Sequence, residues 1–277
     1  MVPRAIPPET VERWCARLVR TTDPEAKFAP ESPPPLALDA SWERAPAPLR
    51  LDAPGRPAHL EVVARAPGAP RPEALREPRA RARLLLTFAH HELQAAELFA
   101  WAVLAFPDTP REFRSGLVRL ALEELAHRRA YVAHAARLGL ADGAVPVRDW
   151  FWERVAACAD PAAFTALQGL GLEGANLEHA ARYARAFRAA GDEPGARVLE
   201  AVEADEVLHV AFAARWFAFF SGAPLDYDRW RAALPAPLTP ALLQGRPLNV
   251  AARRRAGLDE AFLARLAAEP DPGARGR

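Results

Sequence analysis

The sequence predicts an all-α protein whose core is a bundle of four long helices. Three observations support this prediction: long runs with helical apolar periodicity, proline or glycine at their ends, and short links within pairs of runs. The runs cover residues 73–106, 110–138, 161–190 and 193–220. Because the links within each pair are short, we expect two antiparallel hairpins. A longer crossover over 140–160 joins them.

The ends of the four runs carry residues that start or stop helices. Pro107 ends the first run and Pro110 begins the second, because proline is tolerated only in the first turn of a helix. Gly139, Gly191 and Gly222 follow the other three runs, where helices commonly end in glycine. Each of the four helices therefore has a predicted end.

Proline-rich extensions flank the bundle on both sides. The first is an N-terminal arm over residues 1–72, which we expect to pack on the core and to contain one short helix near 9–19. The second is a C-terminal extension over residues 223–277 with short helices, and its end at 270–277 is predicted to be disordered. The predicted bundle domain covers residues 73–222.

The composition narrows the class of function. The 36 Lys and Arg residues and 35 Asp and Glu residues give a net charge of +1, which argues against a nucleic-acid partner. No uncharged apolar stretch reaches the roughly 20 residues of a membrane helix, and the first residues lack the apolar run of a signal peptide. Cys15 and Cys158 have no metal or redox spacing. We therefore expect a cytoplasmic protein.

Two short motifs of the same form stand in the second and fourth runs. The second run holds EELAH over 123–127, and the fourth holds DEVLH over 205–209, so each is an acidic residue followed by Glu-x-x-His. Residues three apart lie on the same face of a helix. Each motif therefore points one carboxylate and one imidazole toward the same place.

An upstream glutamate completes each motif. Glu92 precedes Glu124 by 32 residues, and Glu173 precedes Glu206 by 33. Four carboxylates and two imidazoles in this order form the ligand set of a two-metal site inside a four-helix bundle. The predicted metal ligands are Glu92, Glu124, His127, Glu173, Glu206 and His209. The alternative is that these residues are surface charges and core histidines.

A second register of the upstream glutamates stays open. Glu97 and Glu178 follow Glu92 and Glu173 by five residues, so the two halves of the chain repeat weakly. Five residues correspond to about 140° around a helix, so both members of a pair cannot face one site. The near-equal separations of 32 and 33 residues favour Glu92 and Glu173, but the register of Glu97 and Glu178 also repeats, with separations of 27 and 28.

Other charged residues have predicted roles near the site. We expect Glu123 and Asp205 to accept hydrogen bonds from the ligand histidines, since a metal-bound His usually donates its other N–H to a carboxylate or a carbonyl. The alternative for both is a solvated acid. The basic run Arg253–Arg255 is expected on the solvated surface, with contact to a substrate phosphate as the alternative.

Carboxylate and imidazole ligands suit iron, manganese or zinc better than copper(I). We expect two metal ions, with iron first and a mixed Mn/Fe pair or manganese as alternatives. No cofactor other than the metals is expected.

With these residues placed, the chain resembles the DUF455 family of ferritin-like proteins. The resemblance rests on the segments 88–98 (FAHHELQAAEL), 124–127 (ELAH), 149–152 (DWFW), 173–179 (EGANLEH), 205–210 (DEVLHV), 55–57 (GRP) and 245–249 (GRPLN). More distantly, the chain is similar to rubrerythrin, bacterioferritin, tRNA-hydroxylating di-iron enzymes and di-iron oxygenases. The resemblance implies a ferritin-like bundle with a di-iron site, and it supplies no substrate.

The expected function is that of a di-iron carboxylate oxidoreductase. Such an enzyme activates oxygen or peroxide and oxidises or hydroxylates a small molecule or a modified group, with electrons from a donor protein or molecule. One alternative is a ferroxidase or peroxidase without an organic substrate. Another is a non-catalytic metal-binding or interaction protein. The sequence leaves open the substrate, the electron donor and whether the chain forms a homodimer.

Overall fold

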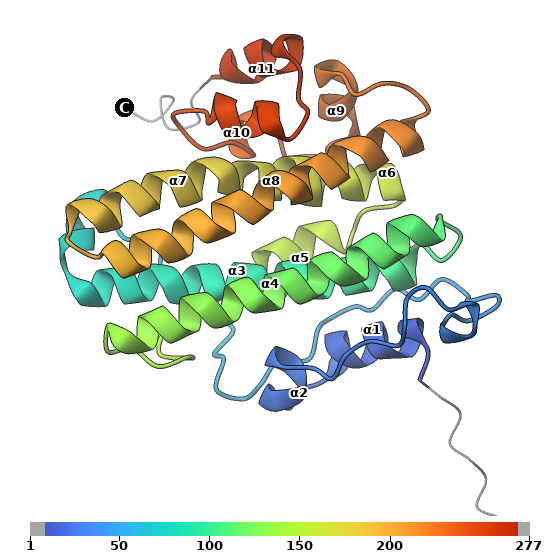
Figure 1. The fold of residues 1–277 in the computed structure, drawn as a ribbon, viewed down its shortest axis with the longest axis horizontal. Helices are drawn as coiled ribbons and strands as arrows, with labels where there is room; N and C mark the ends of the chain where they lie inside the picture. The colour runs from blue at the N-terminus through green and yellow to red at the C-terminus, as the bar shows by residue number, and fades with distance from the viewer. Residues whose placement is uncertain (1–8, 271–277) are drawn as a thin grey trace, which may run out of the picture. The chain divides into compact units, whose positions relative to one another are not determined.

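The computed structural model describes residues 9–270, and the predicted all-α class is confirmed for them (Figure 1). Within this range the β-structure consists of an isolated parallel bridge between Val62 and Val147. The predicted disorder of residues 270–277 falls, apart from residue 270, outside the described range. None of the described helices combines the length and the apolar composition needed to cross a membrane.

The chain divides into two compact units. The first unit comprises Met1–Pro67, Thr87–Arg129 and Asp142–Ala156, and the second comprises Gly68–Leu86, Ala130–Ala141 and Ala157–Arg277. The division falls inside two long helices, α3 (Pro78–Ala105) and α4 (Arg111–Arg137). The division into an arm, a bundle domain and a C-terminal extension stays a prediction from the sequence.

The first unit joins the N-terminal arm to the C-terminal part of α3 and the N-terminal part of α4. Its other elements are α1 (Val11–Arg20), α2 (Pro24–Phe28), the 3-10 turn η1 (Asp39–Ser41) and α5 (Trp150–Val155). Thr10 caps α1 by accepting a hydrogen bond from the backbone N of Arg13 at 3.3 Å. The apolar face of α1 is buried through Trp14 and Leu18. Further along the arm, the backbone N of Leu49 donates to the carbonyl of Leu104 near the end of α3.

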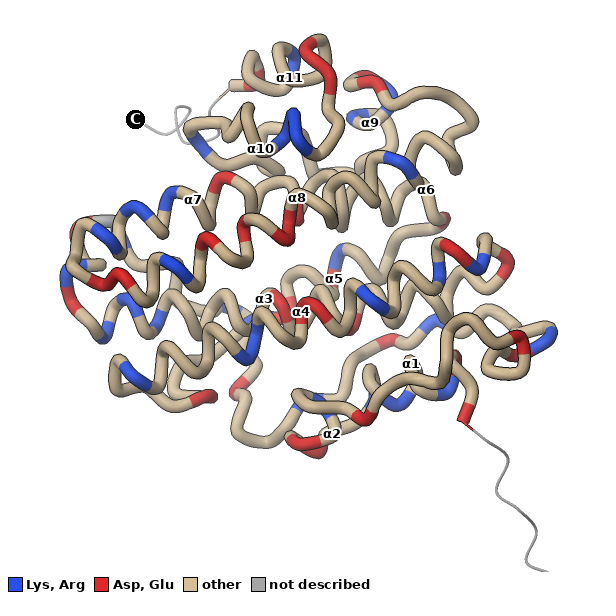
Figure 2. The backbone as a smooth tube through the Cα atoms, viewed as in Figure 1, with Lys and Arg blue, Asp and Glu red and all other residues tan. Residues whose placement is uncertain are grey.

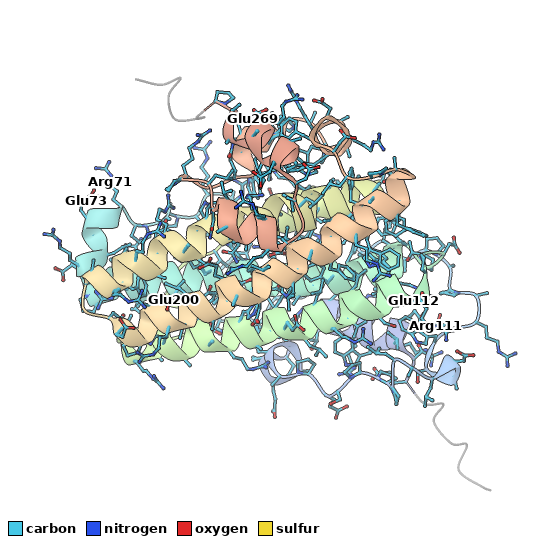
Figure 3. All side chains as sticks on the ribbon, turned by 45° about the horizontal axis from the view of Figure 1, so that its top comes forward. Arg71, Glu73, Arg111, Glu112, Glu200 and Glu269 are labelled. Carbon is cyan, nitrogen blue, oxygen red and sulfur yellow. The ribbon has the colours of Figure 1, made fainter. Side chains whose placement is uncertain are left out.

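The second unit is built on a long helical hairpin. Its elements are η2 (Pro72–Arg76), α6 (Pro161–Phe164), η3 (Thr165–Glu173), α7 (Gly174–Ala189), α8 (Glu193–Ser221), α9 (Tyr227–Ala233), η4 (Pro240–Leu242), α10 (Val250–Arg255) and α11 (Glu260–Ala267). Figure 1 shows α7 and α8 side by side, and α10 contacts both of them. Gly191 in the tight connection has a φ of +78°, which favours glycine. On the outside of the hairpin, Arg188 pairs with Glu200, which Figure 3 labels on α8.

One predicted helix differs from the structure in a way that matters for the site. The sequence predicts a continuous helix over 161–190, but Thr165–Glu173 form a π-helix between α6 and α7. The wider turn brings the backbone of this segment against its neighbours. A Cβ on Gly169 would lie 2.2 Å from the Cβ of Ala213, and one on Gly171 would lie 2.9 Å from a methyl group of Leu243. Residue 169 must therefore be glycine, whereas a Cβ at residue 171 would require the flexible side chain of Leu243 to shift.

Candidate metal centre

The first unit brings three predicted ligands together. Glu92 comes from α3, and Glu124 and His127 come from consecutive turns of α4. One ligand atom from each of the three lies within 4.8 Å of the others, and all three side chains are buried. Within α4, Nδ1 of His127 lies 3.2 Å from Oε2 of Glu124. We call these three residues the first triad.

The second unit brings together the other three. Glu173 is the last residue of the π-helix, and Glu206 and His209 lie one turn apart on α8. Their ligand atoms also lie within 4.8 Å of one another, and all three side chains are buried. Nδ1 of His209 is 3.2 Å from Oε2 of Glu206, which matches the spacing in the first triad. These residues are the second triad.

Two amides that the sequence did not single out bind the carboxylates of the second triad. Nε2 of Gln168 donates to Oε1 of Glu173 at 2.5 Å, and Nδ2 of Asn176 donates to Oε1 of Glu206 at 2.8 Å. Gln168 precedes Glu173 by five residues. In a π-helix the backbone bonds join residues five apart, so these two side chains lie on successive turns. In the α-helix that the sequence predicts, residues 168 and 173 would point about 140° apart. For this reason the sequence did not indicate Gln168.

All four triad glutamates are buried, and this bears on whether the triads suit a metal ion. Taking a carboxylate out of water costs several kcal/mol unless a cation or hydrogen bonds compensate for it. Figure 2 shows how acidic residues recur along α8, which carries part of the second triad. A bound cation would compensate for the cost of burying these carboxylates, and carboxylate with imidazole is a suitable donor set for iron, manganese or zinc. The buried Glu and His groups can therefore hold a metal ion.

The first glutamate of the alternative register lies in a buried ion pair of the first unit. Glu97 Oε1 is 2.8 Å from Nζ of Lys27 and 2.5 Å from a guanidinium nitrogen of Arg56. Lys27 also donates to the carbonyls of Leu18 and Val19 at the end of α1. Burial lowers the pKa of Lys27, and the charge of Glu97 opposes this shift. Glu97 therefore anchors the N-terminal arm to α3.

Arg56 extends this ion pair into a network with the crossover. Its guanidinium lies 3.1 Å from Oδ1 of Asp149, which also lies 2.9 Å from Nε2 of His90. Burial acts to raise the pKa of Asp149, but the hydrogen bond with His90 and the charge of Arg56 lower it below its usual value. The arm, α3 and the start of α5 are thus joined by charged side chains.

The second glutamate of the alternative register has the same kind of role in the second unit. Glu178 is buried and binds Nε and Nη2 of Arg253, each at 2.8 Å. It also accepts hydrogen bonds from the backbone N of Gly245 and of Asn249, both at 3.0 Å. Neither Glu97 nor Glu178 belongs to a triad, although metal ligation by Glu92 and Glu173 stays a prediction.

Four further residues named from the sequence are placed as follows. Glu123 and Asp205 have exposed side chains, and their hydrogen bonds to the ligand histidines stay a prediction. The expectation of a solvated run is wrong for Arg253, whose exposed fraction is 0%. The reason is the buried carboxylate of Glu178, which requires a cation. Its neighbour Arg254 is exposed, as expected, and pairs with Glu260 at 2.6 Å.

The chain was compared with curated proteins, solved structures and protein families. No curated protein and no solved structure matches the chain. The model of the DUF455 family, described as "Protein of unknown function (DUF455)", matches residues 15–264. This range includes both triads and both buried glutamate anchors, and it confirms the resemblance to DUF455 drawn from the motifs. The chain therefore belongs to the DUF455 family.

Proposed function

We propose that the two triads together bind two metal ions and that the protein is a di-iron carboxylate oxidoreductase with a ferritin-like four-helix bundle. The observation that carries the proposal is the repetition of one buried ligand set. Each triad has two glutamates and one histidine, and in each the Glu-x-x-His pair has the same separation of 3.2 Å. Six ligands exceed the four of a tetrahedral zinc site.

Each residue of the triads has a role in this proposal. The glutamates Glu92, Glu124, Glu173 and Glu206 would bind or bridge the metals, and His127 and His209 would be terminal ligands. Gln168 and Asn176 orient the carboxylates of the second triad by the hydrogen bonds that they donate. When bound, two iron ions supply one-electron chemistry with oxygen or peroxide. The substrate would be a small molecule or a modified group.

Oxygen consumption after anaerobic loading with Fe(II) tests the proposed activity. We expect the loaded protein to consume oxygen and the Glu124→Ala variant to consume much less, because one triad loses a ligand. With an added chemical reductant, uptake that continues after the loaded Fe(II) has been oxidised would support the oxidoreductase, whereas uptake that still depends on fresh Fe(II) would favour a ferroxidase. A protein that binds metal and consumes no oxygen or peroxide would contradict the oxidoreductase and favour a non-catalytic metal-binding role.

A further inference from the structure

A buried arginine of the C-terminal segment contacts the backbone next to a triad residue. Nη2 of Arg253 donates to the carbonyl of Gly174 at 2.8 Å, and Gly174 directly follows Glu173 in the chain. The same guanidinium binds both oxygens of Glu178 at 2.8 Å. In an α-helix, residues 174 and 178 lie one turn apart on the same face. Arg253 therefore spans the first turn of α7.

The rest of the C-terminal segment strengthens this contact. Gly245 and Asn249 donate their backbone N–H groups to Glu178, so the carboxylate receives four hydrogen bonds from residues 245–253. A Cβ on Gly245 would lie 2.4 Å from the Cβ of Glu178, so the segment runs directly against α7. These contacts hold the guanidinium in one position.

The hydrogen bond from Arg253 to Gly174 lies at the junction between the π-helix and α7. Glu173 ends the π-helix and Gly174 begins α7, so the helical turn narrows at this point. A π-turn holds more residues than an α-turn, so the residue at which the π-helix changes to an α-helix sets the direction of the preceding side chain. Here that side chain is Glu173. Arg253 binds the Gly174 carbonyl at this junction and the Glu178 carboxylate one turn later.

We propose that Arg253 is a positioning residue for Glu173, so that the C-terminal segment 245–253 is part of the scaffold of the metal centre. The inference rests on the proposed metal site. It assigns Arg253 no contact with metal or substrate. What the inference adds to the proposed metal site is a role for the C-terminal extension, which sets the geometry of the second triad.

Two substitutions test the contact from its two sides. Arg253→Lys keeps the charge but loses the planar fork that reaches Gly174 and Glu178 together. Gly174→Ala places a Cβ 3.0 Å from a guanidinium nitrogen of Arg253, so the guanidinium must shift by a few tenths of an ångström, while the backbone of residue 174 has an ordinary helical φ of −57°. The matched control is Arg254→Lys, because Arg254 is exposed and pairs with Glu260.

Titration with Co(II), followed by its visible absorption, is the measurement. We expect Arg253→Lys and Gly174→Ala each to weaken one of the two Co(II) binding steps by about tenfold and to change its absorption band, as loss of an outer contact does at metal sites. The helical circular dichroism should stay unchanged, and Arg254→Lys should bind like the wild type.

The outcomes separate the inference from the proposed function. If Gly174 is only a helix residue, alanine raises the melting temperature and leaves both Co(II) steps unchanged, and that result would overturn the role of Arg253 while the metal site stands. If Arg253→Lys does not fold, Gly174→Ala decides the question. A wild-type protein that binds no Co(II) would overturn the proposed function and this inference with it.

Discussion

At the residue scale, pairs of glutamates five positions apart have different roles. Glu92 and Glu173 join the triads, whereas Glu97 and Glu178 bind buried cations. The geometry of a helix made such a division predictable, since residues five apart face about 140° away from each other. The cations that bind the second glutamates were not predictable. Arg253 stands in an arginine run typical of a surface, and its partner lies far away in the sequence.

Removing a triad ligand should reduce metal content. We expect Glu124→Ala and His209→Ala each to lose roughly one metal ion per chain, because each removes a buried ligand and leaves its triad with two. Elemental analysis of the purified variants checks this. The control is Glu193→Ala, which changes a partly exposed carboxylate that binds Arg188. Metal content equal to the control in both variants would refute the ligand assignment.

Changing Glu97 should affect stability rather than metal binding. Glu97→Gln leaves the buried ammonium of Lys27 without its carboxylate, while Arg56 keeps Asp149, and breaking a buried ion pair costs about 3–5 kcal/mol. Urea unfolding gives this difference, and elemental analysis of the same sample should give the metal content of the wild type. Loss of metal at unchanged stability would show that Glu97 is a ligand and that the register is wrong.

At the element scale, the ends of the long helices were predictable and the irregular segment was not. Proline and glycine mark the ends of α3, α4 and α8 within a few residues, because both residues act through the local backbone. The π-helix depends on the close approach of Gly169 to Ala213, which is a tertiary contact. Short helices were predicted in the C-terminal extension, but the positions of α9 and α10 were not, because each is too short to show a clear helical periodicity among the prolines.

The N-terminus of α8 offers a test at this scale. Asp192 caps α8 by accepting from the backbone N of Gly195, and it also binds Arg81 and His134. We expect Asp192→Ala to destabilise the protein by about 2 kcal/mol, at the upper end for a lost cap, because two further partners lose their carboxylate. Asp160, an exposed cap of α6, is the matched control, and Asp160→Ala should cost about 1 kcal/mol or less in urea unfolding.

The pH dependence of stability follows from the same carboxylate. Burial acts to raise the pKa of Asp192, but the hydrogen bonds with His134, Gly195 and Arg81 lower it below its usual value. A lowered pKa in the folded state gives stability that is present above the unfolded value of about 3.9 and is lost as the pH falls. Melting temperatures between pH 6 and pH 3 should therefore fall more steeply for the wild type than for Asp192→Asn. Parallel curves would contradict this account.

At the scale of the whole molecule, each compact unit has the same plan. Each unit carries one triad and one buried glutamate that binds a cation from a proline-rich extension. The weak internal repeat in the sequence indicated the triads, because spacing along a helix is a local property. It did not indicate the anchors, because Lys27, Arg56 and Arg253 meet their partners only through the tertiary fold. The extensions are thus bound to the ligand helices by buried charges.

The number of metal ions per chain tests the central claim most directly. Protein purified without chelator and loaded anaerobically with Fe(II) should contain about two iron ions per chain by elemental analysis, because two complete triads supply six ligands. The double variant His127→Ala with His209→Ala should retain far less metal and remain helical. One zinc ion per chain, with no second metal after iron loading, would contradict the account.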